Sequence, residues 1–151
     1  MLLTDLLTVE RIKIPLEGLS KDDLLEELVG ILTRNDGIQD GESVLSAVRE
    51  REAILSTGIG HGVAIPHGKS ASVPALRMAA GRAGAPVDFD ALDGQPVALF
   101  FLLVGPESAA GAHIKALSRI SRLVRRDDVR SRLIAARSPD EFLLTLREAE
   151  A

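Results

Sequence analysis

Two histidines stand among glycines in the middle of the chain, in the stretch GIGHGVAIPHGKS at residues 58–70. The second of them, His67, follows Pro66 and precedes Gly68 and Lys69. A neutral imidazole is a good nucleophile near pH 7, because its reference pKa is about 6.5. Its attack on a phosphoryl group gives a covalent phosphohistidine. The stretch could therefore be a nucleotide-binding loop, a metal site or the setting of a nucleophilic histidine.

The ending Gly-Lys-Ser at 68–70 is shared with phosphate-cradling P-loops, but the spacing before it differs. A P-loop has its first glycine five residues before the glycine of that ending, and Val63 occupies this position. Pro66 has no N–H to offer a phosphate, and Pro74 interrupts the helix that should follow. These residues argue against a nucleotide-binding loop.

The histidines also make a poor set of metal ligands. His61 and His67 are six residues apart, and His113 is the only other histidine. The chain has no cysteine and no H-E-x-x-H motif. His61 is more simply a turn residue on the rim of the site that His67 forms. We predict no bound metal and no cofactor.

A phosphorylated His67 would need an exposed ring and donors for a charge of about −2. A strand end followed by a loop would expose the ring. Glycine N–H groups can approach phosphate oxygens, and cationic side chains can offset their charge. Arg51 lies upstream of the histidine as one such cation. As support for a phosphoryl group we predict Thr57, Gly62, Gly68 and Lys69.

His113 lies where a helix should begin, after residues 105–112. It shares an apolar stripe with Leu117, Ile120 and Val124, so it should face inward at the first helical turn. A helix N-terminus favours anions and disfavours imidazolium. A neutral His113 could donate a hydrogen bond to a phosphoryl oxygen, or it could be a partly buried histidine of the core. The residues alone leave both interpretations open.

The rest of the chain must position these residues, and its size fits one domain over residues 1–151. The chain is 46% apolar and 26% charged, as is ordinary for soluble domains. The absence of cysteine suits a reducing cytoplasm, where we expect the protein to act. No apolar run approaches the ~20 residues of a membrane span, so we expect no membrane insertion. The net charge of −4 gives no pull toward nucleic acid.

Apolar spacing predicts strands and helices in mixed order. Strands are expected at residues 10–14, 63–65, 76–83 and 97–104. The first should be an edge strand that Pro15 stops, and Pro66 should end the second. The run 97–104 is apolar throughout, so both faces of its sheet should be covered.

Helices are expected before, between and after these strands. The first should run from the N-cap Ser20 to about 35–37, and the second over about 42–53. The C-terminal third should be helical, with a capping box at 138–141. This order predicts a three-layer α/β domain, α+β in some classifications.

Several blocks of the sequence, taken in order, resemble a known family. They are Arg51-Glu52, STGIG at 56–60, GVAIPHGK at 62–69, VDFDALDGQPV at 87–97, and His113 with the helix after it. Together they are similar to the IIA domain of the fructose–mannitol class of the bacterial sugar phosphotransferase system. The resemblance covers roughly residues 3–149.

The resemblance implies a fold, a chemistry and roles for three residues. It implies a single α/β domain with a mixed central sheet flanked by helices. His67 would be the phosphorylated residue, His113 the second active-site histidine, and Arg51 a residue that stabilises the phosphoryl group. The phosphoryl donor would be phospho-HPr or its nitrogen-branch counterpart, supplied in turn by phosphoenolpyruvate.

Within that family, the PHGK ending and the block FDALDGQPV at 89–97 resemble the stand-alone nitrogen-related IIA proteins, which act as regulators. We expect no IIB or IIC segment and, as partner, either a regulated protein or a IIB acceptor. The alternative is a separate sugar-specific IIA that passes phosphate to IIB. Nothing resembles a nucleic-acid-reading motif. One arginine cluster is a solvated helix face or a docking surface for a partner: Arg119, Arg122, Arg125, Arg126, Arg130 and Arg132.

Overall fold

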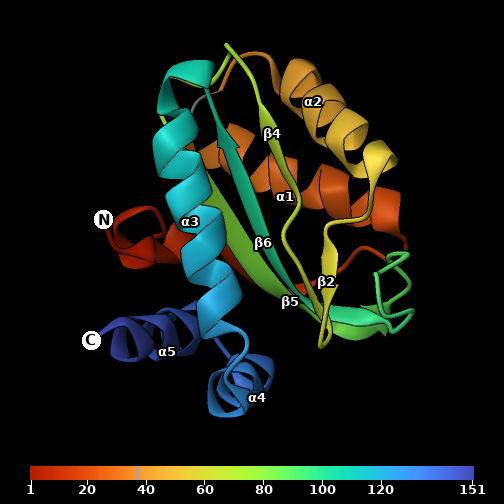
Figure 1. Ribbon diagram of the computed structural model, residues 1–151, viewed down its shortest axis with the longest axis vertical. Coiled ribbons are helices and arrows are strands. Elements are labelled where there is room, and N and C mark those ends of the chain that lie inside the picture. Colours follow the sequence, from red (N-terminus) through yellow and green to blue (C-terminus); the bar gives the residue numbers. More distant parts are fainter. Residues whose placement is uncertain (37) are drawn as a thin grey trace.

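A mixed β-sheet runs through the middle of the molecule in the computed structural model (Figure 1), which describes residues 1–36 and 38–151. Six strands are found in these residues: β1 (Ile12–Leu16), β2 (Gly58–Gly60), β3 (Val63–Ala64), β4 (His67–Lys69), β5 (Arg77–Val87) and β6 (Val97–Gly105). They are ordered β1-β5-β6-β3-β2, and β4 also pairs with β6. The pairs β1–β5, β3–β6 and β4–β6 are parallel, whereas β5–β6 and β2–β3 are antiparallel.

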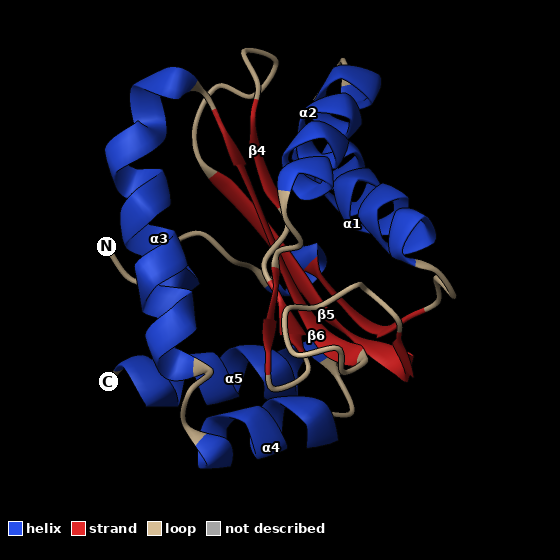
Figure 2. Cartoon of the chain, turned by 45° about the vertical axis from the view of Figure 1, so that its right-hand side comes forward, coloured by secondary structure: helices blue, strands red, loops and turns tan. Residues whose placement is uncertain are grey.

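Helices cover both faces of this sheet (Figure 2). Helices α1 (Lys21–Asp36) and α2 (Gly41–Ile54) lie on one face, and α3 (Ala110–Leu123), α4 (Asp127–Ala135) and α5 (Pro139–Glu150) lie on the other. Three short 3₁₀ helices, Leu3–Asp5, Val9–Arg11 and Glu107–Ala109, complete the described elements. The predicted three-layer α/β arrangement is confirmed.

The central strand β6 explains why both faces must be covered. Its side chains alternate: one set packs toward α3, α4 and α5 (Leu99, Phe101 and Leu103) and the other toward α1 and α2 (Phe100, Leu102 and Val104). All six are fully buried. The continuous apolar run predicted a strand covered on both faces, and the structure has one.

Strand β1 corrects one detail of the prediction. Pro15 lies inside the strand and does not stop it. Because β1 is an edge strand that pairs only with β5 among the described residues, a residue without an N–H loses no partner on the open side. Pro15 also falls where the β1–β5 register shifts, between Lys13 and Leu16.

Two strands of three residues each, β2 and β4, were not predicted from the sequence. Both are rich in glycine and too short to show an alternating pattern. The strand predicted at 63–65 is present as β3, and the strand predicted at 76–83 continues to Val87.

Both predicted N-cap serines cap their helices, but the capping box predicted at 138–141 is only half formed, because the Glu141 carboxylate accepts the Arg137 N–H at 2.8 Å and not the Ser138 N–H. The Ser20 hydroxyl accepts the Asp23 N–H at 3.2 Å, and the Ser138 hydroxyl accepts the Glu141 N–H at 3.2 Å. Gly37, the last residue of the expected end of the first helix, lies outside the described residues. Within the described residues, none of the helices has the length and apolar character that crossing a bilayer requires.

Candidate active site

One cleft of about 450 Å³ brings together residues from three elements. It lies where the C-terminal half of α2, the strand β4 and the first turn of α3 meet. Its lining consists of Ala47, Glu50, Arg51, Ile54, His67, Gly68, Lys69 and His113. Five of the seven predicted site residues are therefore in one place, although Arg51 and His113 are 62 positions apart in the sequence.

The pairing of β4 with β6 sets the direction of each side chain at the cleft. His67 is opposite Leu103 and Gly68 is opposite Val104. Because partners in register share a face, His67 and Lys69 point to the α3 side and Gly68 faces α2. A Cβ atom at residue 68 would lie only 3.0 Å from the backbone N of Val48, so glycine allows α2 to approach the strand.

The structure corrects the expected setting of His67. We expected the ring to be exposed on a loop after a strand, but His67 opens strand β4 and is half-buried. The strand forms because β6 supplies backbone partners that the local sequence cannot reveal.

The ring of His67 is held in one orientation by its own backbone neighbourhood. Its Nδ1 lies 2.9 Å from the carbonyl oxygen of Ile65. A carbonyl oxygen only accepts hydrogen bonds, so Nδ1 carries the hydrogen and a neutral ring keeps its lone pair on Nε2. Burial lowers the pKa of His67, and Arg51 and Lys69 lower it further, while the Ile65 carbonyl and Glu52 act in the opposite direction. The ring is consequently neutral near pH 7.

His113 lies against His67 from the first turn of α3. The two ring centroids are 5.4 Å apart and the rings meet edge to face at 70°. His113 is only 4% exposed, and neither ring nitrogen has a hydrogen-bond partner within the described part of the chain. Burial, followed by the charge that His67 acquires when it is protonated in acid and by the charge of Lys69, lowers the pKa of His113 to about 4. It too is neutral at pH 7.

Two cations border the cleft from opposite sides. The guanidinium of Arg51 donates from Nη1 to the carbonyl oxygen of Leu55 at 2.7 Å, just past the end of α2. The ammonium of Lys69 pairs at 3.4 Å with Glu107, in the 3₁₀ helix before α3. This exposed pair is weak, so Lys69 can exchange its partner for a stronger anion in the cleft.

The remaining two predicted residues, Thr57 and Gly62, are outside the cleft lining. Thr57 is 4% exposed, and both its N–H and its hydroxyl donate to the carboxylate of Glu52. Gly62 has a φ of 75° in the turn between β2 and β3, and its carbonyl oxygen accepts the N–H groups of Ala98 and Leu99.

His61 is in the same turn, with a φ of 57°, and its N–H donates to Asp93 at 3.2 Å. The turn assignment was therefore right. Its expected place on the rim of the site was wrong, because this turn lies beside the start of β6 while His67 pairs with Leu103 near the end of that strand. A group of three or more side chains suited to hold a metal ion is not found in residues 1–36 and 38–151.

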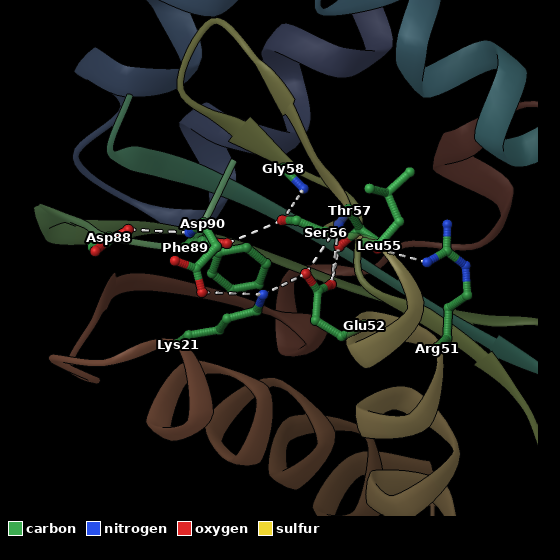
Figure 3. A network of polar contacts seen from close by, with 10 residues as sticks. All are labelled: Lys21, Arg51, Glu52, Leu55, Ser56, Thr57, Gly58, Asp88, Phe89 and Asp90. Carbon is green, nitrogen blue, oxygen red and sulfur yellow. Dashed lines mark hydrogen bonds and ion pairs between the residues drawn. The ribbon is translucent and has the colours of Figure 1, made fainter. Parts of the chain in front are cut away.

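Sequence reasoning missed three lining residues on α2: Ala47, Glu50 and Ile54. Together with Arg51 they follow the spacing i, i+3, i+4 and i+7 of one helix face. Counting this spacing from Arg51 would have identified the other three residues as neighbours of Arg51 on the same face of the helix. The contacts that link Lys21, Glu52 and Thr57 (Figure 3) were also missed, because they join α1 to the end of α2.

The six arginines of the cluster differ in their surroundings. Arg126, Arg130 and Arg132 form ion pairs with nearby carboxylates, as expected of a solvated surface. Arg119, which also lies 3.8 Å from the Glu150 carboxylate, lines a separate groove of about 450 Å³ along α3 together with Arg122. Arg125 lines another groove, beside His61.

Residues 5–149 match the model of a protein family described as "Phosphoenolpyruvate-dependent sugar phosphotransferase system, EIIA 2". The chain belongs to this family. Among its EIIA 2 relatives, the nitrogen regulatory protein of Bradyrhizobium diazoefficiens is 41% identical over 137 residues, which are 91% of this chain and 89% of that protein. The PTS system fructose-specific EIIABC component of Bacillus subtilis is 40% identical over 143 residues, which are 95% of this chain but only 22% of that longer protein.

Solved structures agree with this assignment. The crystal structure of nitrogen regulatory protein IIA-Ntr from Neisseria meningitidis superposes with a TM-score of 0.89 at 36% identity, covering 95% of this chain and 98% of that one. IIA mannitol from Escherichia coli, at 20% identity and a TM-score of 0.78, shares the fold. The chain is thus a type-2 IIA domain of the phosphotransferase system, with a phosphotransferase role, and both the nitrogen regulatory and the sugar-specific branches are represented among its relatives.

Proposed function

We propose that this IIA domain carries a phosphoryl group on Nε2 of His67, received from phospho-HPr or its nitrogen-branch counterpart. The observation that carries the proposal is the contact between Nδ1 of His67 and the Ile65 carbonyl oxygen. It leaves the Nε2 lone pair as the nucleophile of a half-buried ring that borders the cleft. A neutral, oriented imidazole is what attack on phosphorus requires.

The transfer itself needs little rearrangement at His67. The Nε2 lone pair forms the new N–P bond while the N–P bond to the donor's histidine breaks, and that electron pair remains on the donor ring. The hydrogen on Nδ1 of His67 stays where it is. The Ile65 carbonyl oxygen then stabilises the partial positive charge that the phosphorylated ring acquires.

The charge on the phosphoryl group, about −2, would be offset by groups from each wall of the cleft. Arg51 reaches from the end of α2, and Lys69 shares the strand face of His67. His113 is held neutral by burial, and a neutral imidazole still has one ring N–H that can donate to a phosphoryl oxygen. These are the roles we propose for Arg51, Lys69 and His113. Gly68 contributes by letting α2 approach.

The partner downstream separates two branches. We favour a nitrogen-related regulator, because two nitrogen regulatory proteins match over 89% and 87% of their own length at 41% and 38% identity. In that branch the phosphorylation state of His67 would control a partner protein. The second candidate is a sugar-specific IIA that passes the phosphoryl group to a IIB protein, and the fructose-specific relative favours it.

Incubation with phosphoenolpyruvate, the general phosphotransferase protein and HPr tests the proposal. We expect one phosphate per chain that is acid-labile and alkali-stable, and that is absent from His67→Ala. His61→Ala is the matched control, because that histidine is in a turn away from the cleft, and it should label as the unchanged protein does. Labelling of His67→Ala would refute the assignment.

The same labelled protein decides the branch. When the labelled protein is mixed with a fructose-class or mannitol-class IIB protein, a sugar-specific IIA would transfer its phosphate to IIB. A regulator would keep its phosphate. His113→Ala should still be labelled, but more slowly. A rate equal to that of the unchanged protein would remove the proposed role of His113.

A further inference from the structure

A buried carboxylate, that of Glu52, lies in the last turn of α2, next in sequence to Arg51 (Figure 3). The side chain of Glu52 is 4% exposed, and its oxygens accept three donors: the Lys21 ammonium at 2.8 Å, the Thr57 N–H at 3.0 Å and the Thr57 hydroxyl. Glu52 is not part of the cleft lining. A charge is tolerated at such depth only when it is paired and hydrogen-bonded, and this one is both.

Lys21 is itself fixed on several sides. Its ammonium lies 4.9 Å from the ring centroid of Phe89 and 3.9 Å from Asp90, besides its contact with Glu52. The ion pair therefore ties the first residue of α1 to the last turn of α2, and Figure 3 shows the side chains converging from both elements.

A chain of hydrogen bonds leads from this ion pair to the reactive ring. Thr57, anchored on Glu52, accepts the Ile65 N–H on its carbonyl oxygen at 3.0 Å. The Ile65 carbonyl oxygen in turn accepts the Nδ1–H of His67 at 2.9 Å. Glu52 is thus connected to the ring through two backbone segments, each bonded to the next.

A second branch of the same network reaches Arg51. Its guanidinium donates to the carbonyl oxygen of Leu55, two residues before Thr57. The segment 55–57 therefore holds Arg51 through Leu55 and His67 through Thr57 and Ile65. Whatever anchors this segment sets the position of both side chains in the cleft.

We infer that Glu52 is a positioning residue for phosphoryl transfer, which keeps His67 in the tautomer with hydrogen on Nδ1 and keeps Arg51 at the cleft. The inference rests on the proposed function in so far as it concerns transfer. It also assigns a different part to Thr57, which acts through the buried carboxylate and not by touching the phosphoryl group.

The chemistry of the three donors explains why a carboxylate is needed. Glutamine at residue 52 would place an NH₂ group against an N–H, a hydroxyl or an ammonium, so at least one donor would face another donor. Lys21→Met alone would leave the carboxylate buried without its cation. The double variant Lys21→Met with Glu52→Leu removes both charges, leaves neither unpaired and takes away the acceptor of both Thr57 donors.

A pair of variants at Thr57 isolates the link with little risk to the fold. Thr57→Val keeps the shape and the N–H but removes the hydroxyl bond to Glu52, and Thr57→Ser restores that hydroxyl. Thr33→Val is the matched control, because Thr33 is a partly buried threonine on α1 whose hydroxyl donates to the Gly30 carbonyl oxygen.

Two measurements are made on each variant. Single-turnover transfer from phospho-HPr should slow about tenfold in Thr57→Val and at least as much in the double variant, as expected when a hydrogen bond to a charged group is lost. Thr57→Ser and Thr33→Val should stay within about twofold of the unchanged protein. Far-UV circular dichroism checks that each variant is folded.

The second measurement needs no transfer. Nitrogen-15 chemical shifts of the His67 ring in the unphosphorylated protein report which nitrogen carries the hydrogen. We expect the Nδ1–H tautomer in the unchanged protein and in Thr57→Ser, and a mixture of tautomers in Thr57→Val and the double variant. A pure Nδ1–H tautomer together with undiminished transfer in those two variants would overturn the inference. If the unchanged protein accepts no phosphoryl group, the proposed function fails, while the tautomer measurement still decides the role of Glu52.

Discussion

The stability of the protein should depend on pH in a way that reports the burial of His113. The folded state holds the pKa of this ring at about 4, against an ordinary value of 6.5. Each unit of difference corresponds to about 1.4 kcal/mol, so the difference amounts to about 3 kcal/mol of unfolding free energy. The variant that removes it is His113→Leu, which loses no hydrogen bond found among the described residues.

The direction follows from which state binds the proton. Above pH 6.5 the ring is neutral in both the folded and the unfolded state, so its titration does not change the unfolding free energy. Between pH 6.5 and 4 the unfolded chain binds a proton that the folded protein does not, and stability falls as the pH is lowered. Below pH 4 both states are protonated and the loss levels off.

Chemical unfolding at a series of pH values between 7 and 4 measures this loss. Because the chain has no tryptophan and no tyrosine, the transition is best followed by far-UV circular dichroism. Other groups titrate in this range, so the informative quantity is the difference between the unchanged protein and His113→Leu. That difference should move by about 3 kcal/mol in favour of the variant between pH 7 and pH 4. Parallel pH curves, or a His113 proton resonance that titrates near pH 6.5, would refute the reasoning.

Three further predictions concern the site and its supports. Gly68→Ala should lower the unfolding free energy by about 1–3 kcal/mol, because the new Cβ would meet the α2 backbone at 3.0 Å; denaturant unfolding measures it, and no loss would mean that α2 moves freely. Ser138→Ala should cost about 1 kcal/mol by removing the N-cap of α5, and Ser138→Thr should restore most of it in the same assay. Phosphorylation of His67 should slow on acidification with a midpoint below pH 6.5, since burial lowers the pKa of this ring. An NMR titration of the ring should give the same midpoint, and a value above 6.5 would contradict the burial argument.

Much of the architecture was predictable because its signals are local. The run from Val97 to Val104 is apolar at every position. It therefore predicted a strand whose two faces are both covered. Ser20 and Ser138 mark helix starts through bonds to N–H groups three residues away, which the sequence displays directly. Element type followed from such patterns, whereas the short strand β4 depended on a partner from elsewhere.

The candidate site was predictable in its members but not in its arrangement. His67, His113 and Arg51 were recognisable from their neighbours and from the family resemblance. Thr57 was expected to support a phosphoryl group, yet the structure places its donors on Glu52. The sequence shows that a threonine follows a glutamate by five residues, and it does not show that α2 ends between them and turns one onto the other.

The sequence by itself determined which chemistry the chain could support and where helices and the main strands begin. Both depend on residue type and on spacing within a few positions. Only the tertiary structure decided that the ring centroids of His113 and His67 are 5.4 Å apart, that Nδ1 of His67 bonds the Ile65 carbonyl oxygen, and that Glu52 is buried. Those contacts depend on hydrogen bonds and packing between different elements of the fold. Residue type and spacing within a few positions cannot predict them.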